Sequence, residues 1–214
     1  MLQYLHVGKK LGEKWLFADI SLEVKAGELV WLEGTSGSGK SVLFDMALGF
    51  AAPTAGNVFV NGTSPARAGF HARQQLRRGI SLVRDDEVDD RDPVATWLAL
   101  GPWCAGQLWE RSCGASREAL EKASLTGAAG LPFCELSRGE RAALSGARAL
   151  ARRPHLLLVD WPNFFGTSLP GWLADDLRKY LSEGGACLVA GGPEGKAAEW
   201  GGRSVQMELP GAGR

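Results

Sequence analysis

A glycine-rich run of eight residues, GTSGSGKS at positions 34–41, constrains the fold of this 214-residue chain more than any other feature. A short apolar segment, ELVWLE at 28–33, comes directly before it, and VLFDMALG at 42–49 follows with apolar residues at helical spacing. A strand, a glycine loop and a helix form the setting in which the pattern G-x-x-x-x-G-K-[ST] binds phosphate. A surface loop that matched the pattern by chance would need neither neighbour, so we interpret 34–41 as a phosphate-binding loop.

The chemistry of phosphate binding explains the residue types in this loop. Glycines let backbone N–H groups turn toward phosphate oxygens, and the following helix presents about half a positive charge at its N-terminus. Lys40 is expected to reach the β- and γ-phosphates, and Ser41 to ligate Mg²⁺. The predicted nucleotide-binding residues are Gly34, Thr35, Ser36, Gly37, Ser38, Gly39, Lys40 and Ser41.

The rest of the chain alternates strand and helix patterns. Helices are expected within 93–125, over 136–151 and near 173–181, and strands at 17–24, 28–33, within 53–62, at 79–83, 155–160, 186–190 and 204–209. Such alternation indicates an α/β fold with a mainly parallel sheet.

Composition excludes several classes of function. Lys plus Arg equals Asp plus Glu at 24 each, so no basic field points to nucleic acid, and a basic run at Arg73, Arg77 and Arg78 is expected to be a solvated face. The N-terminus lacks the apolar region of a signal peptide, so export is not expected. The longest uncharged stretch, 93–109, is shorter than the ~20 residues of a bilayer span. The four cysteines show no zinc-ligand spacing and are expected to be reduced thiols.

Several further segments, in order along the chain, resemble those of ABC-type ATPases. LSRGER at 136–141 and the helix after it resemble the LSGGQ signature, and LLLVD at 156–160 resembles the Walker B strand. PTAGNVFVNG at 53–62 resembles the turn after the first helix of these proteins, and 76–100 is similar to members that serve lipoprotein release and cell division. The resemblance covers nearly the whole chain.

The resemblance implies a P-loop NTPase fold of ABC type, with a parallel core, a small antiparallel part and an inserted α-helical subdomain. It implies a single nucleotide-binding domain over 1–214, in which the core spans about 1–92 and 150–214 and the helical subdomain about 93–149.

In that family two cassettes stack head to tail, and each ATP lies between one chain's phosphate loop and the other chain's signature. The resemblance therefore implies that Ser137 and Gly139 face the γ-phosphate bound by a partner chain, and that Asp160 holds Mg²⁺ together with Ser41. The alternative for Asp160 is a carboxylate that merely ends a strand. The implied partners are a second cassette, identical or different, and a transmembrane permease subunit. The implied location is the cytoplasm, on the inner face of the cell membrane.

The residues that run hydrolysis in the family are replaced here. The glutamate after the Walker B aspartate is Trp161, whose indole only donates hydrogen bonds. The glutamine before the helical subdomain aligns with Arg84. The switch histidine should fall within 190–193, AGGP, and the histidines present are His6, His71 and His155.

Other positions also depart from the family. Leu11 stands at the position where an aromatic residue of the family stacks on adenine. Trp15, four residues on, is the candidate to replace that aromatic residue, and the favoured interpretation of Trp15 is a core or edge role. Arg138 replaces the first signature glycine, and NFFG at 163–166 replaces the usual D-loop.

Together these changes predict a chain that binds Mg-ATP and turns it over very slowly. We favour a degenerate cassette that lends its signature to an intact partner. A homodimeric ATPase with a substitute base is one alternative, although we expect the acidic patch Asp85, Asp86 and Glu87 to be a solvated loop. A non-hydrolysing scaffold that uses ATP only for dimerisation is another. Trp97, Trp103 and Trp109 either fill the helical subdomain's core, the slightly favoured interpretation, or form a surface on which a permease subunit docks.

Overall fold

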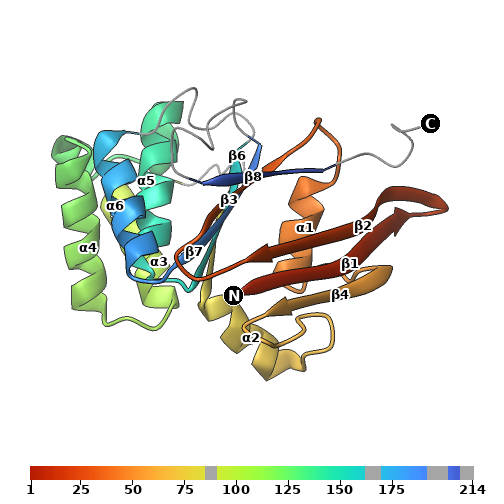
Figure 1. The fold of residues 1–214 in the computed structure, drawn as a ribbon. Helices are drawn as coiled ribbons and strands as arrows, with labels where there is room; N and C mark the ends of the chain where they lie inside the picture. The colour runs from red at the N-terminus through yellow and green to blue at the C-terminus, as the bar shows by residue number, and fades with distance from the viewer. Residues whose placement is uncertain (85–90, 162–169, 192–201, 208–214) are drawn as a thin grey trace.

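A computed structural model describes residues 1–84, 91–161, 170–191 and 202–207 of the chain. It contains a five-stranded sheet and a three-stranded sheet with helices packed around them (Figure 1). In the part of the chain that the structure describes, no helix is both long and apolar enough to span a bilayer.

The larger sheet is parallel throughout, in the order β5-β6-β7-β3-β8. Its strands are β3 (Leu29–Glu33), β5 (Ile80–Val83), β6 (Leu156–Trp161), β7 (Ala186–Gly191) and β8 (Arg203–Gln206). Short apolar runs form these strands because both faces of a parallel sheet are covered. The expected α/β class is confirmed, and the last strand ends at residue 206 rather than 209 within the described residues.

The smaller sheet is antiparallel, in the order β2-β1-β4. It contains β1 (Leu2–Leu11), β2 (Lys14–Val24) and β4 (Ala55–Val60). β1 has no counterpart in the sequence analysis. Its pairing with β2 shifts register between Tyr4 and Lys10, and His6 adopts a left-handed φ of 50°. These irregularities interrupt the period-2 pattern by which a half-buried strand is recognised.

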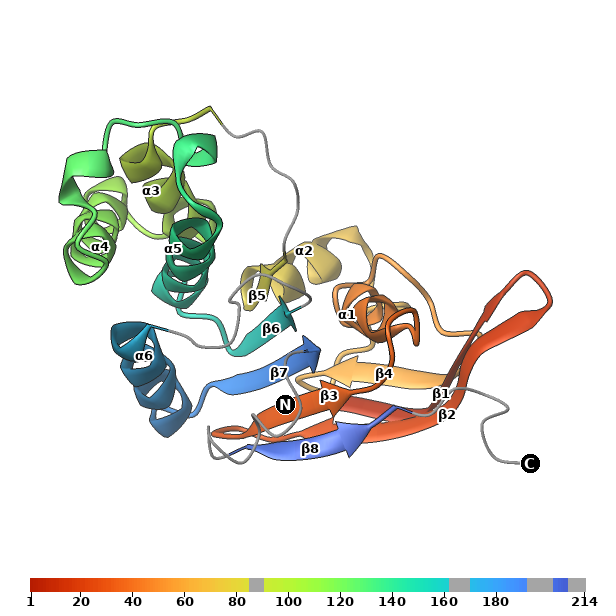
Figure 2. The same cartoon turned by 90° about the horizontal axis from the view of Figure 1, so that it is seen from above.

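Six α-helices pack around the sheets. They are α1 (Lys40–Ala47), α2 (Phe70–Arg78), α3 (Val94–Cys104), α4 (Trp109–Lys122), α5 (Arg138–Ala151) and α6 (Gly171–Ser182) among the described residues. The helical pattern predicted within 93–125 forms two helices. The first, α3, ends two residues after Pro102, and Gly106 then turns the chain with a φ of 100° before α4 begins. Viewed from above, α3, α4 and α5 gather to one side of the parallel sheet, away from α1 (Figure 2).

Alternate residues along each parallel strand enter two different cores. Leu156 and Leu158 of β6 face the core that encloses α1 and the antiparallel sheet. Leu157 and Val159 face the core beneath α5 and α6. Because neighbouring side chains of a strand point to opposite faces, the sheet forms the middle layer between these two groups of elements.

A third core lies within the α3–α5 group, and it divides the three tryptophans. Trp97 is buried and stacks on Phe133 with 3.7 Å between ring centroids, as expected for a core residue. Trp103 and Trp109 are about half exposed and meet edge to face at 5.9 Å. Of the two alternatives, the core role therefore applies to Trp97 and not to Trp103 and Trp109, which lie at the surface.

The basic run on α2 is not a uniformly solvated face, which corrects another expectation. Arg77 donates from Nε to the Leu48 carbonyl over 2.8 Å, and its guanidinium lies 4.1 Å from the centroid of the Phe50 ring. Arg73 donates to the Ala68 carbonyl, whereas Arg78 is exposed. Two of the three arginines thus fasten α2 to neighbouring segments, and α2 itself has no buried residue.

Candidate nucleotide-binding site

The loop between β3 and α1 has a backbone shape that only glycine adopts without strain. Gly34, Gly37 and Gly39 have φ values of 149°, 79° and 94°. A Cβ on Gly39 would lie 2.8 Å from the Phe17 ring, and one on Gly34 would lie 3.0 Å from the Met207 carbonyl oxygen. The loop is therefore fixed on one side by β2 and on the other by the end of β8.

The N-terminus of α1 is open to an anion. Gly39 caps the helix without any side-chain hydrogen bond, and no acidic residue lies in the first turn. The first N–H groups of a helix have no intrahelical partner, so those at Lys40 and Ser41 point toward the loop. Thr35, Ser36, Gly37 and Ser41 are exposed, whereas Ser38 is buried and braces the loop from within. This arrangement is the cradle that the sequence predicts for phosphate.

Lys40 folds back across the loop. Its Nζ donates to the carbonyls of Gly34 and Thr35 over 2.7 and 2.8 Å, and to Ser38 Oγ over 3.2 Å. Burial lowers the pKa of the ammonium group, and the nearby charge of Asp160 opposes that shift. The ammonium group thus lies over the mouth of the cradle, within electrostatic reach of the carboxylate at the end of β6.

Asp160 is held by a cation from the adjacent strand. Arg84 follows β5, and its Nε lies 3.4 Å from Asp160 Oδ2, while its Nη2 lies 3.3 Å from Asp45 Oδ1 on α1. The Nε contact has ion-pair distance without hydrogen-bond alignment, since this buried nitrogen has no hydrogen-bond partner. Asp160 and Arg84 are mostly buried, and Asp45 is one-third exposed. Sequence reasoning placed Arg84 near this site but missed Asp45, because nothing in the sequence marks a residue 39 positions away as its partner.

The signature residues lie elsewhere in the same chain. Ser137 begins α5 in a capping box, in which its Oγ accepts from the Glu140 N–H over 3.3 Å and its own N–H donates to Glu140 Oε2 over 2.8 Å. These hydrogen bonds hold the pKa of Glu140 below its ordinary value. Ser137 and Gly139 are exposed, and α5 lies across β5 and β6 from α1 (Figures 1 and 2). Within one chain the structure does not bring these residues to the phosphate loop.

Several predicted replacements fall only partly within the described residues. Trp161 ends β6, where its backbone pairs with Gly191, the last residue of β7. Asp85, Asp86, Glu87 and the segment 163–166 lie outside the described residues, as do positions 192 and 193.

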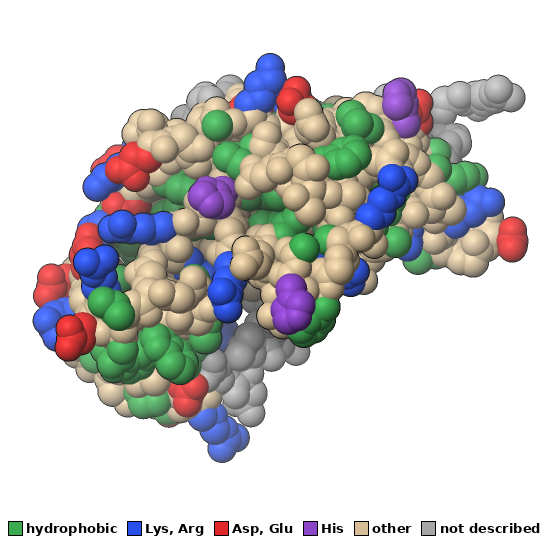
Figure 3. Space-filling model, turned by 90° about the horizontal axis from the view of Figure 1, so that it is seen from below, with side chains coloured by type: hydrophobic (Ala, Val, Ile, Leu, Met, Phe, Trp, Pro, Cys, Tyr) green, Lys and Arg blue, Asp and Glu red, His purple; other side chains and the backbone are tan. Residues whose placement is uncertain are grey.

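The histidines do not form a common site. His6 Nδ1 lies 2.6 Å from Asp19 Oδ1, and His155 lies against Gly79. The three histidines stand apart on the face shown in Figure 3, where acidic and basic side chains mix along the helical edge. Among the described residues, no three His, Cys, Asp or Glu side chains cluster so as to hold a metal.

The two candidates for the adenine position lie in the β1–β2 hairpin. Leu11 and Trp15 are 60% and 41% exposed. The Trp15 ring packs against Gly8, and the ammonium group of Lys10 lies 4.9 Å from its centroid. Trp15 thus lies on the edge strand β2 of the antiparallel sheet, and its stacking on adenine stays a prediction.

Comparisons with known proteins identify relatives of this chain. The family model described as "ABC transporter" matches residues 17–163. The hemin import ATP-binding protein HmuV of Streptomyces coelicolor is 36% identical over 155 residues, which are 71% of this chain and 54% of that protein. The methionine import ATP-binding protein MetN of Caulobacter vibrioides is 34% identical over 142 residues, 66% of this chain and 43% of the relative. The chain spans about half the length of these import proteins.

Other similar proteins match over more of their own length. The cytochrome c biogenesis ATP-binding export protein CcmA of Pseudomonas aeruginosa is 29% identical over 195 residues, 88% of this chain and 91% of that protein. A solved ATP-binding subunit of an ABC transporter superposes with a TM-score of 0.80 at 19% identity, covering 94% of this chain and 82% of that one. A dimeric ATP-binding cassette with bound ADP and Pi gives 0.80 at 24% identity, covering 97% and 94%. The predicted ABC-type fold is thereby confirmed, and the chain belongs to the ABC transporter family and carries its ATP-binding domain.

Proposed function

We propose that this chain is the ATP-binding subunit of an ABC-type membrane transport assembly. The observation that carries the proposal is the position of Lys40, which lies over a glycine cradle at an open helix N-terminus, close to the carboxylate of Asp160. In this proposal residues 34–41 bind the phosphates of ATP. The relatives include import proteins and an export protein, so the proposal specifies membrane transport without a direction.

The family resemblance assigns Mg²⁺ beside the nucleotide to Ser41 and Asp160, and Arg84 already pairs with Asp160 in the structure. Ser41 is exposed in the first turn of α1, and Asp160 lies within electrostatic reach of Lys40. An oxygen-rich set of hydroxyl, carboxylate and phosphate groups suits this hard cation. The ion would supply positive charge beside the phosphate oxygens. Lys40 would exchange its loop carbonyls for phosphate oxygens, because all are acceptors of the same ammonium group.

We propose that hydrolysis at this chain's own site is weak or absent. Trp161 stands directly after Asp160, where the family resemblance calls for a glutamate that activates water. General-base assistance typically contributes about 10²–10⁴-fold to a rate, and an indole cannot supply it.

The exposed start of α5 supports a role toward a partner chain. Ser137 accepts a hydrogen bond from its own helix but retains a hydroxyl proton to donate, and the Gly139 backbone is open to solvent. We propose that both face ATP bound by a second, intact cassette. In the full assembly a permease subunit holds this single domain, with its core at 1–92 and 150–214 and its helical part at 93–149, on the cytoplasmic side of the membrane. The balanced charge gives no support for a nucleic-acid partner.

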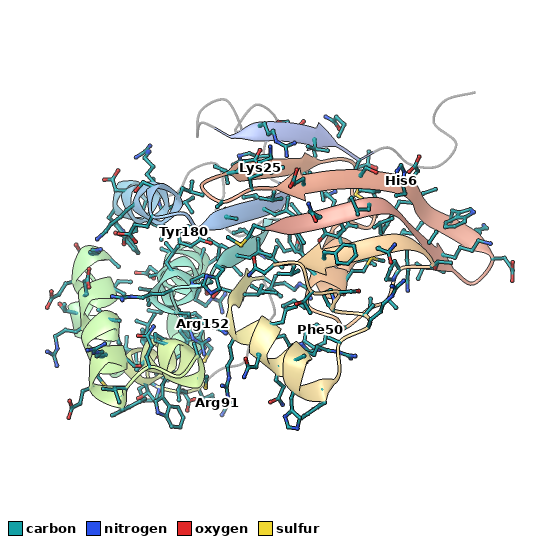
Figure 4. All side chains as sticks on the ribbon, turned by 60° about the horizontal axis from the view of Figure 1, so that its bottom comes forward. His6, Lys25, Phe50, Arg91, Arg152 and Tyr180 are labelled. Carbon is teal, nitrogen blue, oxygen red and sulfur yellow. The ribbon has the colours of Figure 1, made fainter. Side chains whose placement is uncertain are left out.

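The proposal is tested by calorimetric titration of Mg-ATP into the purified chain, with free phosphate measured in the same samples. We expect binding without sustained phosphate release, and loss of binding with Lys40→Ala. Lys25→Ala is the matched control, because Lys25 is exposed at the opposite end of β3 from the loop (Figure 4).

Other outcomes would indicate other functions for this chain. Sustained release that Lys40→Ala abolishes would indicate a homodimeric ATPase with a substitute base. An assembly that keeps its function with Lys40→Ala would indicate a scaffold. Co-purification with an intact cassette supports the proposed pairing, whereas co-purification with only its own copies contradicts it.

A further inference from the structure

Arg84 occupies the place between the phosphate-loop helix and the end of β6. Its guanidinium contacts Asp160 through Nε at 3.4 Å and Asp45 through Nη2 at 3.3 Å. Asp45 belongs to α1, and Asp160 is the carboxylate assigned above to the metal. The cation therefore bridges the two elements that border the nucleotide site.

The charges of this group already balance without any ion. Lys40 and Arg84 carry one positive charge each, and Asp45 and Asp160 carry one negative charge each. Arginine stays protonated at any physiological pH, so its charge cannot be removed to admit another cation. A divalent ion that approached Asp160 would have to displace the guanidinium or accept repulsion from it at short range, and partial burial strengthens that repulsion.

We infer that Arg84 is the built-in counter-cation of Asp160 and competes with Mg²⁺ for it, so that nucleotide binding depends only weakly on the metal. This inference rests on the proposed nucleotide binding and concerns how the same site is charged. Lys40 and the N–H groups of the loop still bind the phosphates, because the hydrogen bonds of Lys40 go to the loop itself. Mg²⁺ that accompanies the nucleotide keeps the phosphates and Ser41 as its ligands and gains little from Asp160.

A purely structural role for Arg84 makes a different prediction. If the residue only tied α1 to the sheet, breaking its Asp45 contact would disturb the site as much as removing the whole side chain. Asp45→Asn removes the charge of that contact, so that at most a neutral hydrogen bond remains, and leaves the pair with Asp160 in place. Metal dependence should therefore respond to Arg84→Gln and not to Asp45→Asn.

The experiment measures the dissociation constant of a non-hydrolysable ATP analogue in saturating MgCl₂ and in EDTA. For the wild-type chain we expect the two constants to agree within about threefold, and for Arg84→Gln to differ by about tenfold or more, the range of ordinary coupling between two ligands. Arg84→Lys, Asp45→Asn and the exposed-site control Arg78→Gln should keep the wild-type ratio of the dissociation constant in EDTA to that in MgCl₂. As a second readout, Mn²⁺ paramagnetic resonance should show more bound metal with Arg84→Gln and nucleotide than with the wild type.

Thermal melting of each variant establishes that it is folded, and the wild-type ratio alone decides the matter if Arg84→Gln does not fold. A wild-type ratio of tenfold or more, or a ratio that a folded Arg84→Gln variant leaves unchanged, would overturn the inference while leaving nucleotide binding intact. Failure of every variant to bind nucleotide in either buffer would instead overturn the proposed function itself.

Discussion

Arg84 Nε and Asp160 Oδ2 lie 3.4 Å apart, so the chain itself supplies a cation to the carboxylate at the end of β6. The two residues follow or end adjacent parallel strands, β5 and β6, whose carboxyl ends meet at the same edge of the sheet. The contact therefore follows from the order of the strands. It makes the free energy of unfolding depend on the charges at the site.

Arg84→Gln should lower the free energy of unfolding by about 1–2 kcal/mol, because it leaves Asp45 and Asp160 without their shared cation and partial exposure weakens the loss. Urea denaturation measures the change. Asp45→Asn should cost less in the Arg84→Gln background than in the wild type, by at least about 0.5 kcal/mol. Equal costs in both backgrounds would mean that the two side chains do not interact.

Gly39→Ala should destabilise the fold by about 2–4 kcal/mol, since a left-handed φ and a Cβ overlapping Phe17 both penalise it. Gly62→Ala is the matched control: its φ is 75°, but a Cβ there would meet no atom within 4 Å. We expect that control to lose only about 1 kcal/mol in the same urea titration and to keep its nucleotide affinity. Equal losses would show that the Phe17 contact is unimportant.

Ser137→Ala should remove about 1 kcal/mol of stability by breaking the capping box of α5. It should also change the response to acid. The pKa of Glu140 is lowered from its ordinary 4.5 in the folded chain, so its contribution is present above that value and is lost as pH falls through the lowered pKa. Unfolding free energy measured between neutral and acidic pH should therefore fall less with Ser137→Ala.

Glu140→Gln provides the control for that titration. The amide oxygen can still accept from the Ser137 N–H but does not ionise at these pH values. This variant should keep most of the helix cap and lose its pH dependence. If the unfolding free energy of both variants changed with pH as it does in the wild type, the ionisation of Glu140 would not contribute to the stability of the helix cap.

Trp97→Ala should cost about 3–5 kcal/mol, because the ring is buried between Phe133 and the guanidinium of Arg148, which lies 4.1 Å from its centroid. Trp103→Ala, at a side chain 50% exposed, should cost less than about 1 kcal/mol. Similar costs for both variants would contradict the division of the tryptophans between core and surface. Chemical denaturation followed by circular dichroism measures both values, independently of the fluorescence that the substitutions remove.

Much of the parallel core could be predicted from the sequence, because β3, β6 and β7 are apolar runs that are buried on both faces. The phosphate loop could be predicted because its features are local in sequence: its glycines set the backbone shape of the loop, and its lysine hydrogen-bonds carbonyls of the same loop. β1 could not, because bulges break its alternation. Neither could α2, which has no buried residue and is held by the bond of Arg77 to the Leu48 carbonyl.

The candidate site divides in the same way. The loop motif indicated Lys40, and the resemblance to ABC-type ATPases indicated Asp160 and the unusual Arg84. Asp45 was missed because its contact depends on tertiary packing, which brings α1 close to Arg84 at the end of β5. The similarity to lipoprotein-release and cell-division members stays a prediction.

The position of β3 in the sheet has a consequence for the order in which the chain is made. β3 lies between β7 and β8, and the phosphate loop rests against the Met207 carbonyl. At the usual pace of ribosomes, about 5–20 residues per second, the apolar residues of β3 are finished roughly 10–30 seconds before either neighbouring strand exists. A growing chain therefore carries an unpaired apolar strand through most of its synthesis, and the nucleotide cradle can be completed only once Met207, which lies against Gly34, has been added.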